Sequence, residues 1–398
     1  MEFDEFVETN LQVWNEYLEK VFCLTSEGIW KLGTGSLLYP NIALFVETDN
    51  HYIFELFGAT KDFKGLEKKT HRFPSTLKYL FQFDSGQEGP TFELNGRNNG
   101  FINLLASRDS DMAAVERRFN INLKSRWPSK FNFVGGKGIV ISFTEKFQSC
   151  FFQNCLLINR YDQIYRVKHL LHMRIVSKDH PKEEYLADLV ELLNKPWKST
   201  HDLFGISYFI DKRDESSILA GQFANIFLLP ELPETTIGKF LEKNPAHILG
   251  AFSCKNFLYE KEFEWIEGNS DPNEKSIKPD LMLERKDGFF DICDLKTAKL
   301  NKPRITKGGH RRRRFIDYVY EGVAQLSNYE DYFNFEKNSA YARAKYNVKV
   351  DNPRLILIVG NYENAPINEI EEASRMLHPN YLIIDYDTLN SMFLNSLT

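Results

Sequence analysis

The pattern of apolar and polar residues changes along the chain, and these changes predict where its elements and domains lie. Residues 2–22 place large apolar side chains near helical spacing, which predicts an amphipathic N-terminal helix. From 28 to 176 the apolar residues form short alternating runs separated by Gly, Pro and Asn, as β-strands do. Two prolines within 230–236 favour a domain boundary. We therefore expect a β-rich domain over 1–230, beginning with a helix, and a second domain over 231–398.

The second domain mixes helices and strands in a different order. Its apolar pattern predicts a helix over 236–252 that is broken near Asn244-Pro245, a hairpin within 276–300, a helix over 315–335, a strand over 354–361, a helix over 367–377 and a strand over 381–386. This order fits a mixed α/β sheet covered by helices. The whole chain is therefore expected to be of the α+β, or mixed α/β, class.

The hairpin within 276–300 carries the candidate chemistry. Gly288 follows Asp287 between two apolar runs, and Gly occupies the left-handed turn position at no steric cost. In a three-residue loop this turn places Asp280 directly opposite Asp294, with Lys296 on the face of Asp294. A two-residue loop would shift the register by one residue and put Asp280 on the other face.

Two facing carboxylates are costly without a cation, because like charges a few ångströms apart repel. One of them takes up a proton, or both share a metal ion, and all-oxygen ligation suits Mg²⁺ or Mn²⁺. A lysine beside such an ion can orient or deprotonate an attacking water and can counter the charge of a phosphate. The alternative is a surface hairpin whose charges are only solvated. The dipeptide Pro279-Asp280 at the matching distance before Asp294 favours the site.

Pro279-Asp280 followed by Asp294-Leu295-Lys296 resembles the PD-(D/E)xK nuclease motif. The longer stretch PDLMLERKDGFFDICDLK resembles the nuclease domain of Shedu anti-phage defence proteins. The resemblance covers roughly 235–398 and, before that, only the order and size of the parts. It implies a nuclease that cleaves or nicks DNA with Mg²⁺ or Mn²⁺. It also implies that Asp280, Asp294 and the Leu295 carbonyl bind the metal and that Lys296 is catalytic.

The same resemblance suggests two further site residues. Glu242, in the stretch FLEKNP, matches an upstream acidic residue of the Shedu domain, with Glu262 and Glu264 as rivals. Gln325 and Tyr329 lie one helical turn apart and resemble the Q-x-x-x-Y motif of RecB-like nucleases. This motif implies that Gln325 lies against the active site.

Charge is distributed unevenly along the chain. The net charge of −5 argues against a protein that coats nucleic acid along its whole surface, so DNA contact would need a local basic patch. From Lys296 to Arg314 there are nine Lys or Arg residues and no acid. The expected phosphate contacts are Lys307, His310, Arg311, Arg312, Arg313 and Arg314. The alternatives are a localisation signal or a solvated run.

The remaining expectations concern compartment, partners and regulation. No secretory signal or membrane-length apolar run is visible, and five cysteines without a C-x-x-C pair suggest reduced thiols in a cytoplasm. The resemblance implies phage DNA as substrate, a homotetramer, and a nuclease restrained by its N-terminal domain or by oligomerisation. The alternatives are a catalytically inactive nucleic-acid- or partner-binding module on a degenerate nuclease fold, and an oligomeric scaffold.

Overall fold

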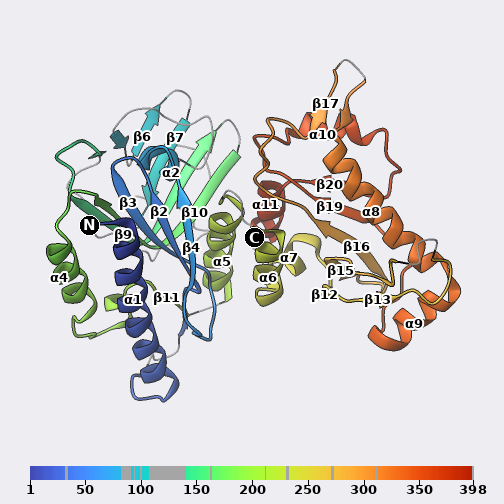
Figure 1. Cartoon of the computed structure of the whole chain (residues 1–398). Coiled ribbons are helices and arrows are strands. Elements are labelled where there is room, and N and C mark those ends of the chain that lie inside the picture. The colour runs from blue at the N-terminus through green and yellow to red at the C-terminus, as the bar shows by residue number, and fades with distance from the viewer. Residues whose placement is uncertain are drawn as a thin grey trace. The chain divides into compact units, whose positions relative to one another are not determined.

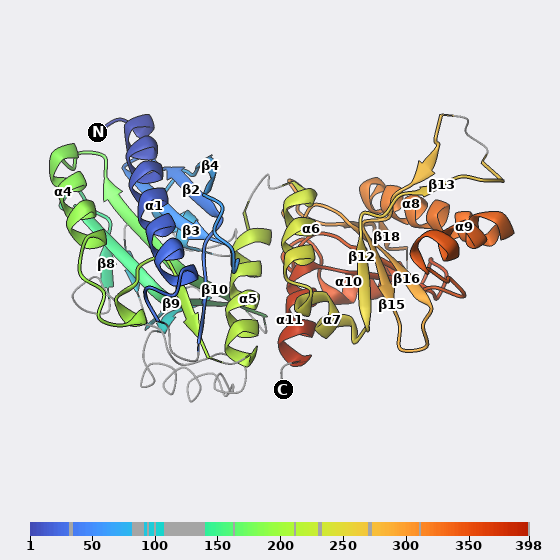
Figure 2. The same cartoon turned by 90° about the horizontal axis from the view of Figure 1, so that it is seen from below.

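A computed structural model describes residues 1–31, 35–81, 91–93, 95–98, 101–106, 140–161, 164–210, 212–229, 233–269, 273–309 and 312–396. The chain forms two compact units, Met1–Asn225 and Ile226–Thr398 (Figures 1 and 2). The division lies close to the boundary expected at residue 230. Both units combine helices and strands, which confirms the expected mixture of α and β structure.

The first unit is built on a large, mostly antiparallel sheet. Its strands are β1 (Ser36–Leu38), β2 (Ile42–Glu47), β3 (His51–Phe57), β4 (Glu67–Arg72), β5 (Thr91–Glu93), β6 (Asn95–Asn98), β7 (Phe101–Ala106), β8 (Val140–Ser142), β9 (Ser149–Tyr161), β10 (Ile164–Ser177) and β11 (Ser207–Phe209). Its helices are α1 (Phe3–Ser26), α2 (Thr76–Leu80), α4 (Lys182–Leu193), the 3₁₀ helix η1 (Thr200–Asp202) and α5 (Lys212–Phe227), whose last residues belong to the second unit. Seven strands pair in the order β4-β2-β3-β10-β9-β7-β6. Only the β2–β4 pairing within this sheet is parallel.

Helix α1 buries its apolar stripe against one face of this sheet. The Phe6 ring stacks on Tyr52, and Trp14 lies 5.4 Å from the ring centre of Phe54. Each such aromatic side chain is shielded from water, and burying it stabilises the unit by roughly 1.5–3 kcal/mol. The helical spacing seen in the sequence thus corresponds to the contact surface of α1.

The second unit contains a five-stranded mixed sheet between two layers of helices. Its strands are β12 (Asn256–Tyr259), β13 (Phe263–Glu264), β14 (Ser276–Ile277), β15 (Leu281–Glu284), β16 (Phe290–Leu295), β17 (Thr306–Lys307), β18 (Arg314–Phe315), β19 (Leu355–Ile358) and β20 (Tyr381–Ile384). Its helices are α6 (Glu234–Lys243), α7 (Ala246–Phe252), α8 (Asp317–Asn334), α9 (Glu336–Tyr346), α10 (Ile367–Ser374) and α11 (Tyr386–Ser396). The sheet order is β12-β15-β16-β19-β20, antiparallel up to β16 and parallel beyond it. Helix α8 covers one face, and α6, α7 and α11 lie on the other (Figures 1 and 2).

The β15–β16 hairpin has the expected three-residue loop. Gly288 adopts a left-handed φ of 86°, and the Arg285 amide donates to the Phe289 carbonyl at 2.8 Å. Leu281 pairs with Cys293, so the next residue back, Asp280, falls across from Asp294. The register inferred from the turn chemistry is confirmed.

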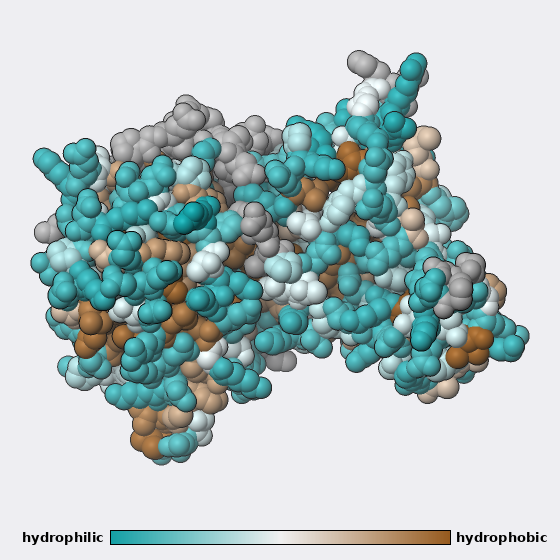
Figure 3. Space-filling model, viewed as in Figure 1, coloured by the Kyte–Doolittle hydropathy of each residue, from teal (hydrophilic) through white to brown (hydrophobic). Residues whose placement is uncertain are grey.

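The face of the molecule drawn in Figure 3 is largely polar. Hydrophilic side chains cover most of the face drawn in Figure 3, and apolar atoms reach the surface near the end of α1, where Ile29 is 66% exposed. No helix in the described ranges is both long and apolar enough to cross a membrane.

Candidate active site

The ends of β15 and β16 bring Asp280, Asp294 and Lys296 together. Asp280 immediately precedes β15, and its Oδ2 accepts a hydrogen bond from the Leu295 amide at 2.7 Å. In a strand the N–H and C=O of one residue point to the same neighbour, so the Leu295 carbonyl also faces the side on which Asp280 lies. The next amide, that of Lys296, points the other way and donates to Ile358 at 2.8 Å. The backbone thus places two of the predicted metal ligands, the Asp280 carboxylate and the Leu295 carbonyl, on the same side of β16.

Asp294 and Lys296 form a buried ion pair on the face of the sheet that α8 covers. Asp294 Oδ2 lies 2.7 Å from Lys296 Nζ, and the two side chains are 1% and 15% exposed. The Lys296 ammonium is therefore the cation that faces this carboxylate oxygen. Taking two charges out of water is costly even when they are paired, and perturbed buried charges of this kind are typical of functional sites.

Burial and mutual repulsion perturb the acids of this site. Burial raises the pKa of Asp280, and the Leu295 amide and Lys296 only partly oppose it. Burial also raises the pKa of Asp294 to about 7, with a further contribution from the charge of Asp280. Burial disfavours the Lys296 cation, but the ion pair with Asp294 and the charges of Glu234 and Asp280 together raise its pKa. The site therefore holds a charged lysine beside carboxyls that retain protons more readily than usual.

Helix α8 fixes the lysine head group. Lys296 Nζ donates to Gln325 Oε1 at 2.8 Å, and the Gln325 amide donates to the Tyr329 hydroxyl one turn later. Tyr329 in turn donates to the Lys278 carbonyl at 3.2 Å, close to the start of β15. This chain orients the Gln325 side chain with its oxygen toward the ammonium. The structure thus brings Gln325 to the site, where the Q-x-x-x-Y resemblance placed it.

Gly322 gives the lysine room to reach this position. A Cβ added at Gly322 would lie 2.7 Å from Leu357 Cδ1 and 3.3 Å from Lys296 Cε. Glycine inside a helix costs roughly 1 kcal/mol relative to alanine. Close packing over the lysine stem is the physical reason for a glycine here. Sequence reasoning missed this residue, since a single glycine in a helical pattern has no specific meaning.

The acidic residue of α6 that lies at the site is Glu234 rather than the expected Glu242. Glu234 Oε1 accepts hydrogen bonds from Thr297 Oγ1 and the Tyr318 hydroxyl, both at 3.0 Å. Its charge also raises the pKa of Asp280 and of Asp294. Glu242 lies on the same helix but is exposed. A glutamate in the first turn after a proline is common at any helix start, so the sequence held no specific indication of Glu234.

The other acidic candidates take part in peripheral contacts. Glu262 accepts a hydrogen bond from Ser276 at 2.6 Å, and Glu264 pairs with Lys345 at 3.4 Å. Both side chains are exposed. Neither is among the main charges acting on Asp280.

The basic run divides into paired and exposed residues. Arg313 makes ion pairs of 3.0 and 2.9 Å to Glu369 and Glu372, which tie the β17–β18 hairpin to α10. Lys307 lies 2.7 Å from Asp317 at the start of α8. Arg312 and Arg314 are exposed. His310 and Arg311 lie outside the described residues.

The donor set fits a hydrated oxygen-seeking ion. Among the described residues no three His, Cys, Asp or Glu side chains are arranged to hold a metal. Mg²⁺, however, often takes only one or two carboxylates and completes its shell with water and substrate phosphate. Two carboxylates, Asp280 and Asp294, together with the Leu295 carbonyl meet that requirement.

Comparisons with known proteins add no assignment. No protein-family profile matches the chain, and neither a curated protein nor a solved structure matches it.

Proposed function

We propose that the second unit is a divalent-metal-dependent DNA nuclease with a PD-(D/E)xK fold. The observation that carries this proposal is the convergence of Asp280, Asp294 and Lys296 at the end of the β15–β16 hairpin, where Asp294 and Lys296 are buried together. Two carboxylates and an ammonium at one strand end suit phosphodiester hydrolysis, which needs a cation at the phosphate and a positioned water. The alternation of antiparallel and parallel strands around β16 agrees with the mixed sheet that the resemblance implies.

The chain's own residues have separable roles in this mechanism. Asp280, Asp294 and the Leu295 carbonyl would hold Mg²⁺ or Mn²⁺. The bound ion would stabilise charge on the phosphate and on the leaving oxygen. Because the carboxylates raise the pKa of Lys296, its amine stays protonated and acts as a hydrogen-bond donor to the attacking water or to a phosphate oxygen, not as a base. Gln325 keeps the ammonium in that position.

DNA binding is assigned to the exposed part of the basic run. Arg312 and Arg314 are exposed cations on a hairpin that Arg313 anchors to α10. Arginine contacts phosphate bidentately, and neutralising phosphates releases counterions. Cytoplasmic anti-phage defence, DNA of phage origin, a homotetramer and restraint of the nuclease by the first unit or by oligomerisation follow from the resemblance and belong to the same proposal. Light scattering measures the subunit number.

A plasmid-nicking assay tests the site. Full-length wild type should nick supercoiled plasmid in Mg²⁺ or Mn²⁺ but not in EDTA, and Lys296→Ala should lose at least a hundredfold of that activity. Lys286→Ala, at the exposed tip of the same hairpin, is the matched control and should retain wild-type activity. Equal activity of Lys296→Ala and wild type would exclude this site.

A second candidate is a nucleic-acid-binding module that uses the same fold without catalysis. The observation in its favour is that, among the described residues, no group of three His, Cys, Asp or Glu side chains is arranged to hold a metal. Calorimetric titration separates the two functions. The nuclease should bind Mn²⁺ in a way that Asp280→Asn and Asp294→Asn abolish, whereas a binding module should bind DNA equally well with and without the metal.

A further inference from the structure

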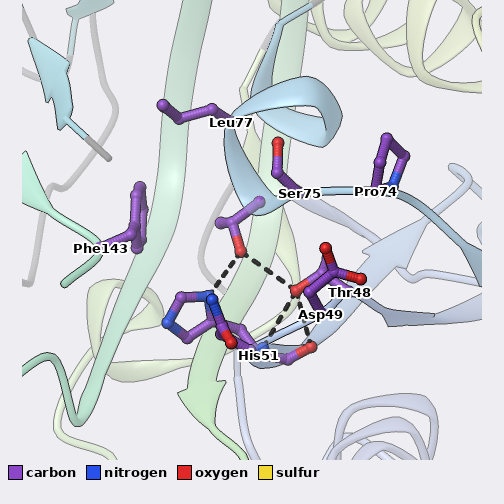
Figure 4. A pocket seen from close by; sticks show the side chains of 9 residues that line it. Thr48, Asp49, His51, Pro74, Ser75, Leu77 and Phe143 are labelled. Carbon is purple, nitrogen blue, oxygen red and sulfur yellow. Dashed lines mark hydrogen bonds between the residues drawn. The ribbon is translucent and has the colours of Figure 1, made fainter. Parts of the chain in front are cut away.

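A pocket of about 220 Å³ opens in the first unit, separate from the residues assigned to the nuclease (Figure 4). It lies between the β2–β3 turn, the segment that leads into α2, and Phe143 after β8. Its lining residues are Thr48, Asp49, Asn50, His51, Pro74, Ser75, Thr76, Leu77 and Phe143. This space is smaller than the roughly 300 Å³ or more of pockets that enclose drug-sized ligands, so a ligand of that size would be only partly enclosed.

Giving each hydrogen-bond contact on the pocket floor a hydrogen, the 3.4 Å contact included, assigns a tautomer to His51. Thr48 Oγ1 donates to the His51 carbonyl at 3.0 Å, so its only hydrogen is used there. The contact of 3.4 Å between the Thr48 and Thr76 hydroxyls must then use the hydrogen of Thr76. In the contact of 2.8 Å between Thr76 Oγ1 and His51 Nδ1, the hydrogen then belongs to Nδ1, and the threonine oxygen accepts. This is the one assignment that gives every contact a hydrogen, and it leaves Nε2 of His51 with a lone pair.

The ring stays neutral at physiological pH. Burial lowers the pKa of His51, and the charge of Lys178 lowers it further. Glu47, the partner of Lys178, and the exposed Asp49 are the acids nearby in the chain. His51 Nε2 is therefore a hydrogen-bond acceptor, and it lies on the Phe143 side of the ring in Figure 4.

The pocket is apolar at the end near His51 and carries a carboxylate at the other end. The Phe143 ring and Leu77 provide apolar walls near His51, whereas the Asp49 carboxylate lies on the side of Pro74 and Ser75 (Figure 4). A ligand that satisfies this arrangement has a planar ring with an N–H donor at one end and hydroxyl donors at the other. An aromatic ring favours stacking with a base, and a carboxylate is the usual partner of ribose hydroxyls.

We propose that this pocket binds an amino-bearing nucleoside, with the exocyclic amine of the base donating to His51 Nε2 and the ribose hydroxyls donating to Asp49. The source is a free nucleoside or nucleotide, or an unpaired residue of a nucleic-acid strand. The proposal does not depend on the nuclease function of the second unit.

Matched ligand pairs test each contact in the full-length protein. Histidine ring ¹⁵N spectra, with the His51 signals assigned through His51→Gln, should show the Nδ1–H tautomer and should shift on addition of adenosine or cytidine. Inosine and uridine, which carry a carbonyl in place of the amine, should bind at least roughly tenfold more weakly. 2′,3′-Dideoxyadenosine should bind to wild type more weakly than adenosine by a similar factor. In Asp49→Asn the two ligands should bind equally well.

The threonine supplies the matched protein variants. Thr76→Val removes the hydroxyl that holds the hydrogen on Nδ1 and should abolish the preference for the amine, whereas Thr76→Ser should keep it. If the His51 ring ¹⁵N signals shift with a single-stranded oligonucleotide but not with free nucleosides, the site is one for nucleic acid. An Nε2–H tautomer in wild type, or no response of His51 to nucleosides and oligonucleotide at millimolar concentration, would overturn the proposal.

Discussion

Replacing Asp294 by Asn should stabilise the metal-free protein at alkaline pH while it abolishes nuclease activity. The carboxylate is 1% exposed, its Oδ2 lies 2.7 Å from Lys296 Nζ, and it lies across the hairpin from Asp280. Asparagine has nearly the same shape and carries no charge. The substitution therefore removes the repulsion and the cost of a buried anion but not the volume of the side chain.

The pKa of Asp294 sets the size and the pH range of the effect. A pKa raised from 3.8 to about 7 means that the folded protein keeps a proton which the unfolded chain has already lost. The stabilising contribution is complete below about pH 4 and disappears as pH rises through 7. At pH 8 the ionised side chain thus costs at most about 4 kcal/mol, since one pKa unit is about 1.4 kcal/mol. This pKa already includes the favourable charge of Lys296, so the ion pair is not subtracted again, and we expect a net gain of about 2–4 kcal/mol, or roughly 4–16 °C.

Calorimetry in EDTA at pH 5 and pH 8 measures the effect. The difference in unfolding temperature between Asp294→Asn and wild type should be small at pH 5 and positive at pH 8. Asp287→Asn is the matched control from the tip of the same hairpin, where the Phe289 amide and Arg285 lower the pKa of the carboxyl. Its unfolding temperature should be no higher than that of wild type at pH 8. A lower unfolding temperature for Asp294→Asn at pH 8 would refute the argument that Asp294 is held at a cost.

Three further experiments test the assignments around the site. Glu234→Gln should lower nicking at least tenfold whereas Glu242→Gln should not, and the reverse result would restore Glu242 as the upstream acid. Arg312→Ala should reduce the slope of log K against log salt by about one in DNA-binding titrations, whereas Arg313→Ala should mainly lower the unfolding temperature, because it breaks the ion pairs to α10. Gly322→Ala should cost about 1–3 kcal/mol of stability and lower nicking together with it; unchanged stability in urea unfolding would contradict the close contact with Leu357 and Lys296.

The hairpin could be predicted from sequence because its geometry is local. One glycine fixes the turn, the turn fixes the register, and the register fixes which side chains share a face. The turn chemistry is therefore enough to place Asp280, Asp294 and Lys296 at one end of the hairpin. A motif places Gln325, and the helical turn on which that motif depends is equally local.

The residues that were missed depend on contacts between distant segments. Glu234 meets Thr297 and Tyr318 only after α6 packs beside the sheet. The pairing of Arg313 with α10 likewise joins segments far apart in the chain, so the amino-acid pattern alone could not divide the basic run into anchoring and exposed arginines. Similarly, the pocket around His51 joins three separate segments of the first unit.

Several departures from ordinary folding rules converge on one spot in the second unit. Asp294 is buried beside Lys296 with a raised pKa, and Gly322 interrupts a helix interior beside the Lys296 stem. A sequence selected only for stability would replace each by a better-packed or better-paired residue. Destabilising features on neighbouring side chains are expected where a site binds a charged ligand. For this reason the end of the β15–β16 hairpin, rather than the more numerous surface charges, is where we place the chemistry of this chain.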